Sequence, residues 1–488
     1  MAAISSVAFA ISFLMSFTFW LTVILITAYL VVWWFRHRIQ KHIGRNRDRI
    51  LQEVGYTADQ APTFVGFFHP YCNAGGGGER VLWTALRDVQ QEFPHVVSVV
   101  YTGDTDCSKE QILLKVRTRF NIDLNPRKLA FVFLTKRYLV EDANYPRMTL
   151  LFQSLGSFVL GYEALANLVP DVFFDTMGYA FTYPLVYMMT QIKIAAYVHY
   201  PTISSDMLQR VYERRPQYNN DARFVTNTVW RTGKLIYYRL FAKIYGFCGS
   251  FADIVMVNST WTKGHIDSLW HTTAEIVHPP CDTERLNELP LVGRKPWIVS
   301  VAQFRPEKDH LLQLRSLAKM LELYPQWKSQ PLELVLIGSS RNEDDERRIA
   351  ELRKECVRLG IQDIVRFEVN ASFDVLVSSL GMAKVGLHTM WNEHFGIGVV
   401  EYMAAGLIPV AHNSAGPKLD IVVDYDGKKT GFLADSVETF AESLHAALML
   451  SDKEYEAMAF RARASTADRF SELLFSTDLL RSLRKCLT

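Results

Sequence analysis

The sequence lacks any cysteine pair or cysteine–histidine spacing of the kind that holds zinc or a disulfide framework. Its six cysteines are scattered over 488 residues, which indicates a reducing compartment. It also lacks a surplus of charge, because 53 basic and 51 acidic residues leave a formal net charge of +2. That balance excludes a chain-wide electrostatic nucleic-acid binder. No internal repeat of roughly 20 to 50 residues is present, which excludes a solenoid.

What the sequence does have is one long apolar run at its N-terminus. Residues 7–35 contain no charged side chain, and a membrane-spanning helix needs about 20 apolar residues. A basic stretch follows at once and includes Arg36, Arg38, Lys41, Arg45, Arg47 and Arg49. A cleaved signal peptide would carry its positive charges before a shorter run. We therefore expect a transmembrane anchor at 7–35, a basic juxtamembrane linker at 36–61 and a cytosolic body.

Two series of short apolar strands alternate with helical segments in the body. The first series is at 63–68, 96–102, 129–134, 172–174, 193–198 and 254–257, and the second is at 297–302, 334–337, 365–369, 384–387 and 408–411. Such strands, separated by helices, indicate parallel sheets covered on both faces. The sequence therefore predicts an α/β fold of two Rossmann-like, doubly wound domains that face a central cleft. We expect them at 62–285 and 296–451, with a hinge at 286–295 and amphipathic C-terminal helices at 452–488.

A glycine-rich loop follows the first strand of the body. Its residues are Gly75, Gly76, Gly77, Gly78 and Glu79. Glycines let the backbone approach a ligand closely, and the N-terminus of the helix that follows favours an anion. A dinucleotide-binding fingerprint fails on spacing, since its third small residue would fall at Arg80. The loop is thus either a ligand-binding loop or a tight turn without a ligand.

Two cations follow the strand at 297–302. Arg305 and Lys308 lie three residues apart on a turn that contains Pro306. Both can point at one diphosphate, the arginine as a bidentate fork and the lysine as a compact charge. The alternative is a solvated turn in which these charges pair locally.

Two glutamates flank the loop that follows the strand at 384–387. The glycines predict a turn into a helix near Gly398, with Glu393 in the loop and Glu401 in the first helical turn. Free backbone N–H groups there suit a phosphate, and carboxylates accept hydrogen bonds from sugar hydroxyls. The N–H groups concerned belong to Phe395, Gly396 and Ile397. The pair therefore favours a nucleotide sugar, the alternative being two glutamates that only stabilise the helix N-terminus.

The spacing of Glu393 and Glu401, with seven residues between them, resembles the Glu-x7-Glu signature of family 4 retaining GT-B glycosyltransferases. Arg305 and Lys308 match the cation pair of that family. The segment Tyr-Val-His-Tyr-Pro at 197–201 resembles its strand-end histidine segment, and the glycine-rich loop resembles its acceptor-side loop.

Further features narrow the resemblance to the α-1,2-mannosyltransferases that extend dolichol-linked oligosaccharide. They are the N-terminal anchor, the segment 69–80 and the Ser-Ala-Gly-Pro motif at 414–417. The likeness covers nearly the whole chain. It implies GDP-mannose as donor, dolichyl-diphosphate oligosaccharide as acceptor, and addition of the fourth and fifth mannoses. It also implies the cytosolic face of the endoplasmic reticulum membrane, contact with membrane lipid and with other enzymes of the same pathway, and no nucleic-acid partner.

The resemblance also implies roles for individual residues. Arg305 and Lys308 would bind the GDP diphosphate, Glu401 the ribose hydroxyls and Glu393 the mannose hydroxyls near the reacting carbon. His199 would lie close to the transferred sugar. The family is described as retaining, by same-face substitution without a covalent enzyme intermediate. We therefore expect electrostatic stabilisation of the departing diphosphate, with no metal and no other cofactor.

Three alternatives remain open. A metal-dependent glycosyltransferase would use an Asp-x-Asp pair after a strand, and Asp104 and Asp106 fit that pattern. A retaining GT-B enzyme could use another donor or lipid acceptor. An inactive membrane scaffold could keep the same fold, because fold does not guarantee function.

Overall fold

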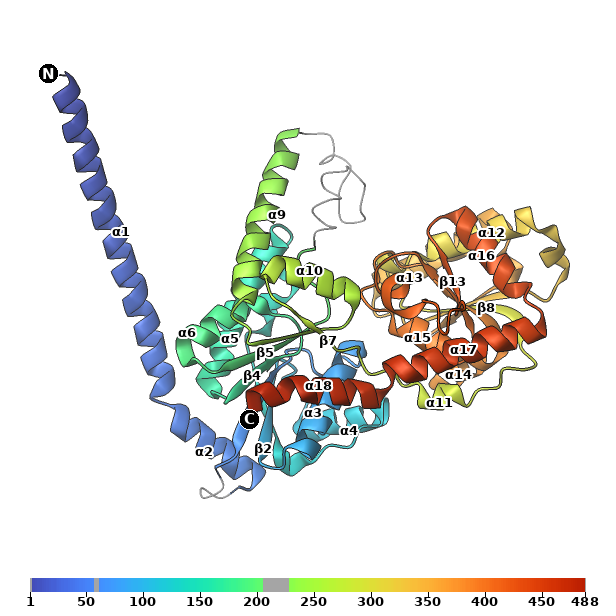
Figure 1. The fold of residues 1–488 in the computed structure, drawn as a ribbon, viewed down its shortest axis with the longest axis horizontal. Helices are drawn as coiled ribbons and strands as arrows, with labels where there is room; N and C mark the ends of the chain where they lie inside the picture. Colours follow the sequence, from blue (N-terminus) through green and yellow to red (C-terminus); the bar gives the residue numbers. More distant parts are fainter. Residues whose placement is uncertain (1, 57–60, 205–227, 488) are drawn as a thin grey trace.

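The computed structural model describes residues 2–56, 61–204 and 228–487, with the backbone alone in 2–14 and 228–231. Two parallel sheets organise the body (Figure 1). The first has the order β3-β2-β1-β4-β5-β6-β7 and the second β10-β9-β8-β11-β12-β13. The predicted pair of doubly wound domains is therefore confirmed.

The strands of the first sheet are β1 Thr63–Phe68, β2 Val96–Thr102, β3 Leu129–Phe133, β4 Val172–Asp175, β5 Lys193–Val198, β6 Ile254–Val257 and β7 Glu275–Ile276. Its helices are α3 Gly77–Glu92, α4 Lys109–Phe120, α5 Thr149–Asn167, α6 Tyr183–Thr190, α9 Thr228–Gly249 and α10 Thr260–Trp270, and the short turn η4 Ala180–Thr182 precedes α6. Almost every residue of β1, β2, β4 and β5 is buried. That is why their sequences read as continuous apolar runs rather than alternating ones.

The strands of the second sheet are β8 Lys295–Val301, β9 Glu333–Gly338, β10 Val365–Val369, β11 Ala383–His388, β12 Ile408–His412 and β13 Phe432–Ala434. Its helices are α11 Glu284–Asn287, α12 His310–Leu323, α13 Glu343–Leu359, α14 Phe373–Met382, α15 Ile397–Ala404, α16 Val437–Leu448 and α17 Asp452–Phe470, and the turns are η5 Pro306–Lys308 and η8 Pro417–Ile421. Chain order reverses between β1 and β4 in one sheet and between β8 and β11 in the other. Ligands of such sheets bind outside the carboxyl ends of the strands at these switch points.

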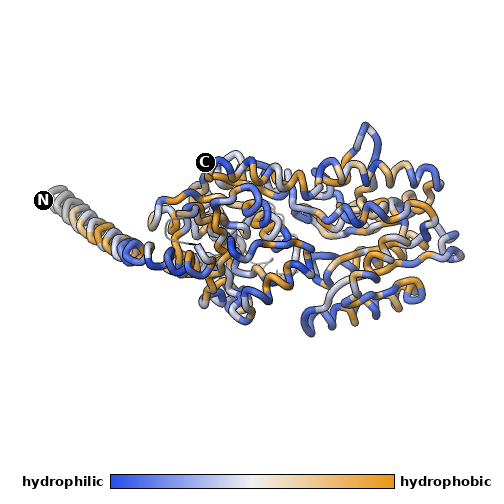
Figure 2. Tube along the Cα trace, turned by 90° about the horizontal axis from the view of Figure 1, so that it is seen from below, coloured by the Kyte–Doolittle hydropathy of each residue, from blue (hydrophilic) through white to orange (hydrophobic). Residues whose placement is uncertain are grey.

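The N-terminal helix α1 (Ala2–Gln40) extends away from the body (Figure 1). Figure 2 shows apolar residues along the coloured part of this helix and polar residues where α2 (Ile43–Val54) begins. Within the described residues, it is the one helix long and apolar enough to cross a membrane. Its last turns pack on the body, where the ring of Phe35 lies 5.0 Å from that of Tyr162 in α5. Length and composition thus support membrane association.

The two domains are connected by two crossings of the main chain. The first lies near Cys281, and the segment after it packs on the second domain, where Arg294 donates to the carbonyls of Leu380 and Ala383 at 2.7 Å each. The second crossing follows α17, because α18 (Glu472–Leu487) returns to the first domain (Figure 1). There Phe475, Leu479 and Leu483 enter the core beside Trp83. The sequence predicted helices at 452–488 but not that the last of them would pack on the first domain.

Candidate functional site

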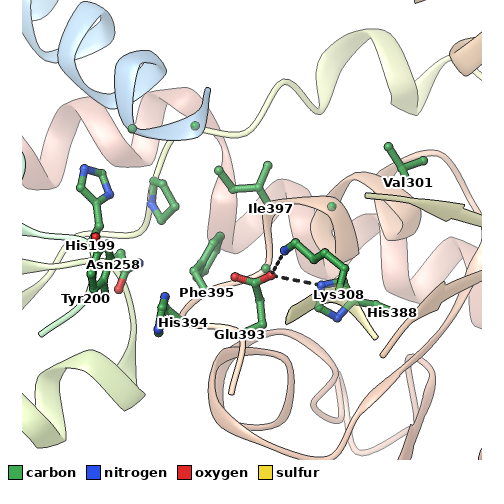
Figure 3. A pocket seen from close by; sticks show the side chains of 15 residues that line it. His199, Tyr200, Asn258, Val301, Lys308, His388, Glu393, His394, Phe395 and Ile397 are labelled. Carbon is green, nitrogen blue, oxygen red and sulfur yellow. Dashed lines mark hydrogen bonds and ion pairs between the residues drawn. The ribbon is translucent and has the colours of Figure 1, made fainter. Parts of the chain in front are cut away.

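A cavity of about 290 Å³ lies between the two domains. Figure 3 shows its lining side chains, which come from the ends of strands in both sheets. The first domain contributes Gly77, Gly78, His199, Tyr200, Asn258 and Pro279, and the second contributes Val301, Lys308, His388, Glu393, His394, Phe395, Gly396, Ile397 and Gly398. Motifs from the two halves of the sequence therefore meet at one site.

Lys308 and Glu393 form an ion pair on the wall of this cavity (Figure 3). The Lys308 ammonium lies 2.6 Å from Oε2 of Glu393, and Nε2 of His388 lies 3.2 Å from the same oxygen. Burial alone would raise the pKa of Glu393, but Lys308 and His388 outweigh it and hold that pKa well below its usual range. Glu393 is thus a carboxylate that accepts hydrogen bonds at the end of β11.

The N-terminus of α15 opens onto the cavity beside this pair. Gly396 precedes the helix with φ of 110°, a conformation that favours glycine. The backbone N–H of Gly416 donates to the carbonyl of Glu393 at 3.0 Å, and that of Asn392 to the Ser414 hydroxyl at 2.8 Å. The Ser-Ala-Gly-Pro motif therefore braces the loop. The N–H groups at the start of a helix and its dipole suit a phosphate.

Glu401 does not lie in the first turn of that helix, as the sequence predicted. The helix begins at Ile397, next to the predicted Gly398, and this difference of one residue places Glu401 just past the first turn. It is not a lining residue of the cavity within the described part of the chain. Burial raises the pKa of Glu401 to about 7, against the opposing charge of Arg80.

Arg305 also stands outside the cavity wall among the described residues. Its guanidinium lies 3.8 Å from Glu307 and is about one-third exposed, at 36%. Lys308 points inward because η5 turns the chain between the two cations. The structure thus brings Lys308, Glu393 and the start of α15 together, while neither Arg305 nor Glu401 is among the described residues that line the cavity.

The glycine-rich loop closes against both sides of the cavity at two of its glycines. A Cβ at Gly77 would come within 2.8 Å of the Ile397 side chain across the cleft, and one at Gly78 within 3.6 Å of Nε2 of His199. A side chain at Gly77 would therefore displace the end of the Ile397 side chain. Gly75, with φ of 86°, and Gly76 precede this contact and do not line the cavity.

Glu79 does not line the cavity but holds the glycine-rich loop in place through contacts with Gly76 and His69. Its carboxylate accepts a hydrogen bond from the Gly76 N–H at 2.5 Å and lies 3.6 Å from Nε2 of His69. Burial opposes its ionisation, but His69 and the Gly76 N–H lower its pKa. Nδ1 of His69 lies 2.8 Å from the Thr176 hydroxyl. His69 begins the segment 69–80, but nothing in that segment predicted its contact with Thr176.

His199 lines the cavity from the end of β5. Its Nε2 lies 3.0 Å from the carbonyl oxygen of Thr176. Because a carbonyl only accepts, Nε2 carries the proton and Nδ1 is left as an acceptor. Burial and the neighbouring His69 lower the pKa of His199 to about 4. His199 is therefore neutral at neutral pH.

Several aromatic and amide side chains at the site were not among the predicted site residues. The rings of Tyr200 and His394 stack across the cleft with centroids 5.1 Å apart, and Trp261 lies 5.2 Å from His394 on its other side. Asn258 lines the cavity with its amide oxygen bound to the Thr262 hydroxyl at 2.7 Å. The two ring contacts depend on how the two domains face each other, which no local pattern encodes.

The Asp-x-Asp pair of the metal-dependent alternative lies away from this cavity. Asp104 forms an ion pair with Arg137 and accepts a hydrogen bond from the Asn73 N–H at 2.9 Å. Asp106 is exposed. In the ranges that the structure describes, no group of three or more histidine, cysteine or acidic side chains could hold a metal ion. Asp104 therefore has a structural role.

Comparison with known families identifies both halves of the body. Residues 62–270 match the family described as ALG11 mannosyltransferase N-terminus, and residues 282–465 match glycosyl transferases group 1. Among solved structures, the N-terminal domain of trehalose-6-phosphate phosphatase from Candida albicans has a TM-score of 0.63 at 13% identity, covering 87% of this chain and 97% of that one. Anabaena Alr3699/HepE in complex with UDP and glucose has a TM-score of 0.55 at 14% identity, covering 86% and 99%. These likenesses show the GT-B fold.

Curated relatives resemble the chain over nearly its whole length. The GDP-Man:Man(3)GlcNAc(2)-PP-Dol alpha-1,2-mannosyltransferase of Mus musculus is 50% identical, covering 96% of this chain and 94% of the relative. The proteins of the same name from Homo sapiens and Dictyostelium discoideum are 52% and 49% identical, covering 86% and 88% of this chain and 86% of each relative. The cleft with its Lys308–Glu393 pair thus sits in a glycosyltransferase, and the chain belongs to the family of GDP-Man:Man(3)GlcNAc(2)-PP-Dol alpha-1,2-mannosyltransferases.

Proposed function

We propose that this protein transfers mannose from GDP-mannose, in α-1,2 linkage, to dolichyl-diphosphate-linked oligosaccharide. The observation that carries the proposal is the identity of 50% over 96% of the chain to a relative that bears the name of this activity. That name specifies an acceptor with three mannoses, which agrees with addition of the fourth and fifth. The reaction belongs at the cytosolic face of the endoplasmic reticulum membrane.

The donor site of this proposal is the wall formed by Lys308, Glu393 and the start of α15. The diphosphate of GDP-mannose lies against the Lys308 ammonium and the N–H groups at Phe395, Gly396 and Ile397. Glu393 accepts hydrogen bonds from mannose hydroxyls. Charge that grows on the departing diphosphate meets groups that are already oriented, which is the usual source of electrostatic catalysis.

Arg305 and Glu401 complete the donor site outside the wall of the cavity. The partly exposed Arg305 side chain reaches the diphosphate as a second cation, and Glu401 accepts hydrogen bonds from the ribose hydroxyls. The reaction retains the anomeric configuration and needs no metal, because protein cations and the helix N-terminus take up the negative charge. His199, neutral with a free Nδ1, lies beside the sugar as a hydrogen-bond acceptor.

The test is a reconstituted transfer. Purified full-length protein in lipid nanodiscs is incubated with GDP-mannose and a lipid-diphosphate-linked acceptor with three mannoses, and the glycan is weighed by mass spectrometry. We expect two added hexoses that an α-1,2-specific mannosidase removes. Transfer only from another nucleotide sugar, or a product that resists that mannosidase, would overturn the proposal.

A further inference from the structure

Three neighbouring helices of the first domain expose an unusual number of large apolar side chains. We name this set the apolar face. Its members are Phe152, Leu155, Phe158 and Val159 on α5, Tyr187 and Met188 on α6, and Ile236, Leu240, Ile244 and Phe247 on α9, each between 37% and 62% exposed. Single exposed apolar residues are ordinary, but a group of this size marks an interaction surface.

The apolar face follows helical stripes rather than random positions. On α9, Ile236, Leu240 and Ile244 recur at every fourth residue, and Phe247 follows three residues later. On α5, Leu155 is followed by Phe158 and Val159 at three and four residues. Residues at these spacings lie on one side of a helix. Both helices therefore turn an apolar stripe outward in addition to the one that packs inward.

Aromatic contacts join the stripes into one surface. The Phe251 ring lies 5.2 Å from Phe247 of α9 and 5.2 Å from Tyr187 of α6. Both α5 and α9 pack on η4, which lies between them. Figure 1 shows α9 extending beyond the sheet, toward the side on which α1 leads to its N-terminus.

The same surface is continuous with the helix that is long enough to span a membrane. The α1 helix packs on α6 and on α5, where Phe35 contacts Tyr162. Phe35 is the last residue of the uncharged run at 7–35. The apolar face thus begins where the apolar part of α1 ends, at the depth of the cytosolic membrane surface.

The charge on these helices fits lipid headgroups. Helix α9 carries the basic residues Lys234, Arg239 and Lys243 and has no acidic residue in its sequence. Helix α5 has a single acidic residue, Glu163, near its C-terminal end. Apolar residues combined with lysine and arginine, without acidic residues, are typical of helices that lie in a membrane interface.

The face is also tied to the catalytic cleft. Strand β5 ends beside His199, which lines the cavity, and the N–H of Thr202 donates to the Tyr245 hydroxyl of α9 at 3.3 Å. We infer that the apolar face rests in the cytosolic leaflet of the bilayer that α1 spans, and so holds the acceptor side of the cleft at the lipid surface. The membrane contact stands on geometry alone, whereas its benefit to transfer rests on the proposed function.

Depth-dependent fluorescence quenching tests the membrane contact without measuring activity. Cys107 and Cys486, the two cysteines that are not buried, are replaced by serine in the full-length chain. Single cysteines then replace Leu155, Leu240 or Phe247 and are labelled with an environment-sensitive dye. Matched controls carry the label at Phe460 of α17 or Leu473 of α18, which are 66% and 75% exposed. The proteins are placed in phosphatidylcholine–phosphatidylserine nanodiscs.

We expect lipids with a spin label on the acyl chain to quench the dye at the three face positions and not at the two controls. Equal quenching at face and control positions, or none at the face, would overturn the inference. The inference would also be overturned if, in detergent, the dyes at the face positions became shielded from water as the protein concentration rose. That result would mean that a second copy of the chain covers the apolar face.

An activity measurement then tests the consequence. The Leu155→Asp, Leu240→Asp double variant should raise the KM for a lipid-linked acceptor in nanodiscs at least about tenfold, since two apolar side chains lose their burial. Its kcat and its KM for a short-chain acceptor in detergent should match the parent. The Phe460→Asp, Leu473→Asp pair is the control. An unchanged KM in nanodiscs would contradict the consequence, while the quenching result holds even if the proposed transfer fails.

Discussion

The Lys308 ammonium lies 2.6 Å from the Glu393 carboxylate, so the cation assigned to the donor diphosphate is paired with the carboxylate assigned to the sugar. His388 bonds the same carboxylate oxygen at 3.2 Å. A phosphate that reaches Lys308 must therefore compete with Glu393. His388 remains to hold Glu393 in place when the lysine turns to the donor.

The first prediction concerns Lys308. Lys308→Ala should weaken donor binding and lower kcat/KM by about 10²-fold or more, because charge on the departing diphosphate loses its nearest cation. Arg305→Ala should show a loss in the same direction if the second cation reaches the donor. Lys308→Arg is the matched control and should recover part of the activity. Near-normal turnover in both alanine variants would move the phosphate site elsewhere.

A double-mutant cycle measures the coupling seen in the structure. Because Lys308 and Glu393 touch, the effects of Lys308→Ala and Glu393→Gln on kcat/KM should not add. The Lys308→Ala, Arg315→Ala pair serves as the additive reference, since Arg315 pairs with Glu355 on α12 and α13, outside the cavity. Additivity within experimental error in the first cycle would contradict a functional ion pair.

The second prediction separates the two glutamates. Glu401→Ala should chiefly raise the KM for GDP-mannose, because a ribose contact is made equally in the ground and transition states. Glu393→Ala should chiefly lower kcat, because it acts near the reacting carbon. Steady-state kinetics with a saturating acceptor gives both constants. The reverse pattern would exchange the two assignments.

The third prediction is a pH dependence of stability caused by Glu401. Burial raises its pKa from the ordinary value of 4.5 to about 7. Between these values the folded protein binds a proton that the unfolded chain does not, so this group lowers the free energy of unfolding as pH rises. Glu401→Gln should therefore melt at the same temperature as the parent near about pH 5 and at a higher temperature near about pH 8.

Thermal unfolding of nucleotide-free protein in detergent gives the melting temperatures of parent and variant at each pH. Subtracting one from the other removes the effect of the groups that titrate in both proteins. Glu355→Gln is the comparison on an exposed helix, where pairing with Arg358 and Arg315 lowers the pKa to about 2. Its difference from the parent should be flat over the same range of pH. A flat difference for Glu401→Gln would mean that the carboxyl titrates normally.

Much of the fold could be predicted from the sequence because buried parallel strands are continuous apolar runs. Strands β1, β2, β5, β6 and β10 have the predicted bounds. Strand β7 has two residues and β13 three, too few to form an apolar run. The return of α18 was not predictable, because an amphipathic helix has an apolar stripe whichever domain it covers.

The site was predicted in part for a similar reason. Lys308 and Glu393 follow strands, so the end of each strand indicated the edge of the sheet on which they lie. Their direct pairing could not be predicted, because it depends on the turn at η5 and on the packing of β8 beside β11. His388, the last residue of β11, could have been noticed as a polar residue at a strand end. Glu401 was placed in the first turn, whereas the helix begins at Ile397, one residue before the predicted Gly398.

The fourth prediction is that transfer continues without a divalent metal. Excess EDTA should leave activity unchanged, since Lys308 and the start of α15 take up the charge that a metal would neutralise. Asp106→Ala should also be active. Asp104→Asn is a better partner variant than Asp104→Ala, because asparagine keeps the hydrogen bond with the Asn73 N–H. Activity that disappears with EDTA and returns with Mg²⁺ or Mn²⁺ would support the metal-dependent alternative.

The fifth prediction concerns topology. The basic stretch after residue 35 predicts a cytosolic body, so protease added to sealed microsomes should digest it. Asn370 is exposed and lies in an Asn-Ala-Ser tripeptide that would be N-glycosylated in the lumen. In a cytosolic body it should carry no glycan. Asn258 is a poor reporter because it is buried, at 5% exposure. Protection of the body, or a glycan on Asn370, would place the body in the lumen.

The return of α18 to the first domain limits how the enzyme can open. Both crossings of the main chain pass one apolar cluster, which contains Cys281 from the first crossing and Phe470 from the second. Because both main-chain crossings between the domains lie at this one place, the domains can rotate about it but cannot slide past each other. We therefore expect the cleft to open for the nucleotide sugar by rotation about this cluster, which also contains Phe395 of the cavity wall.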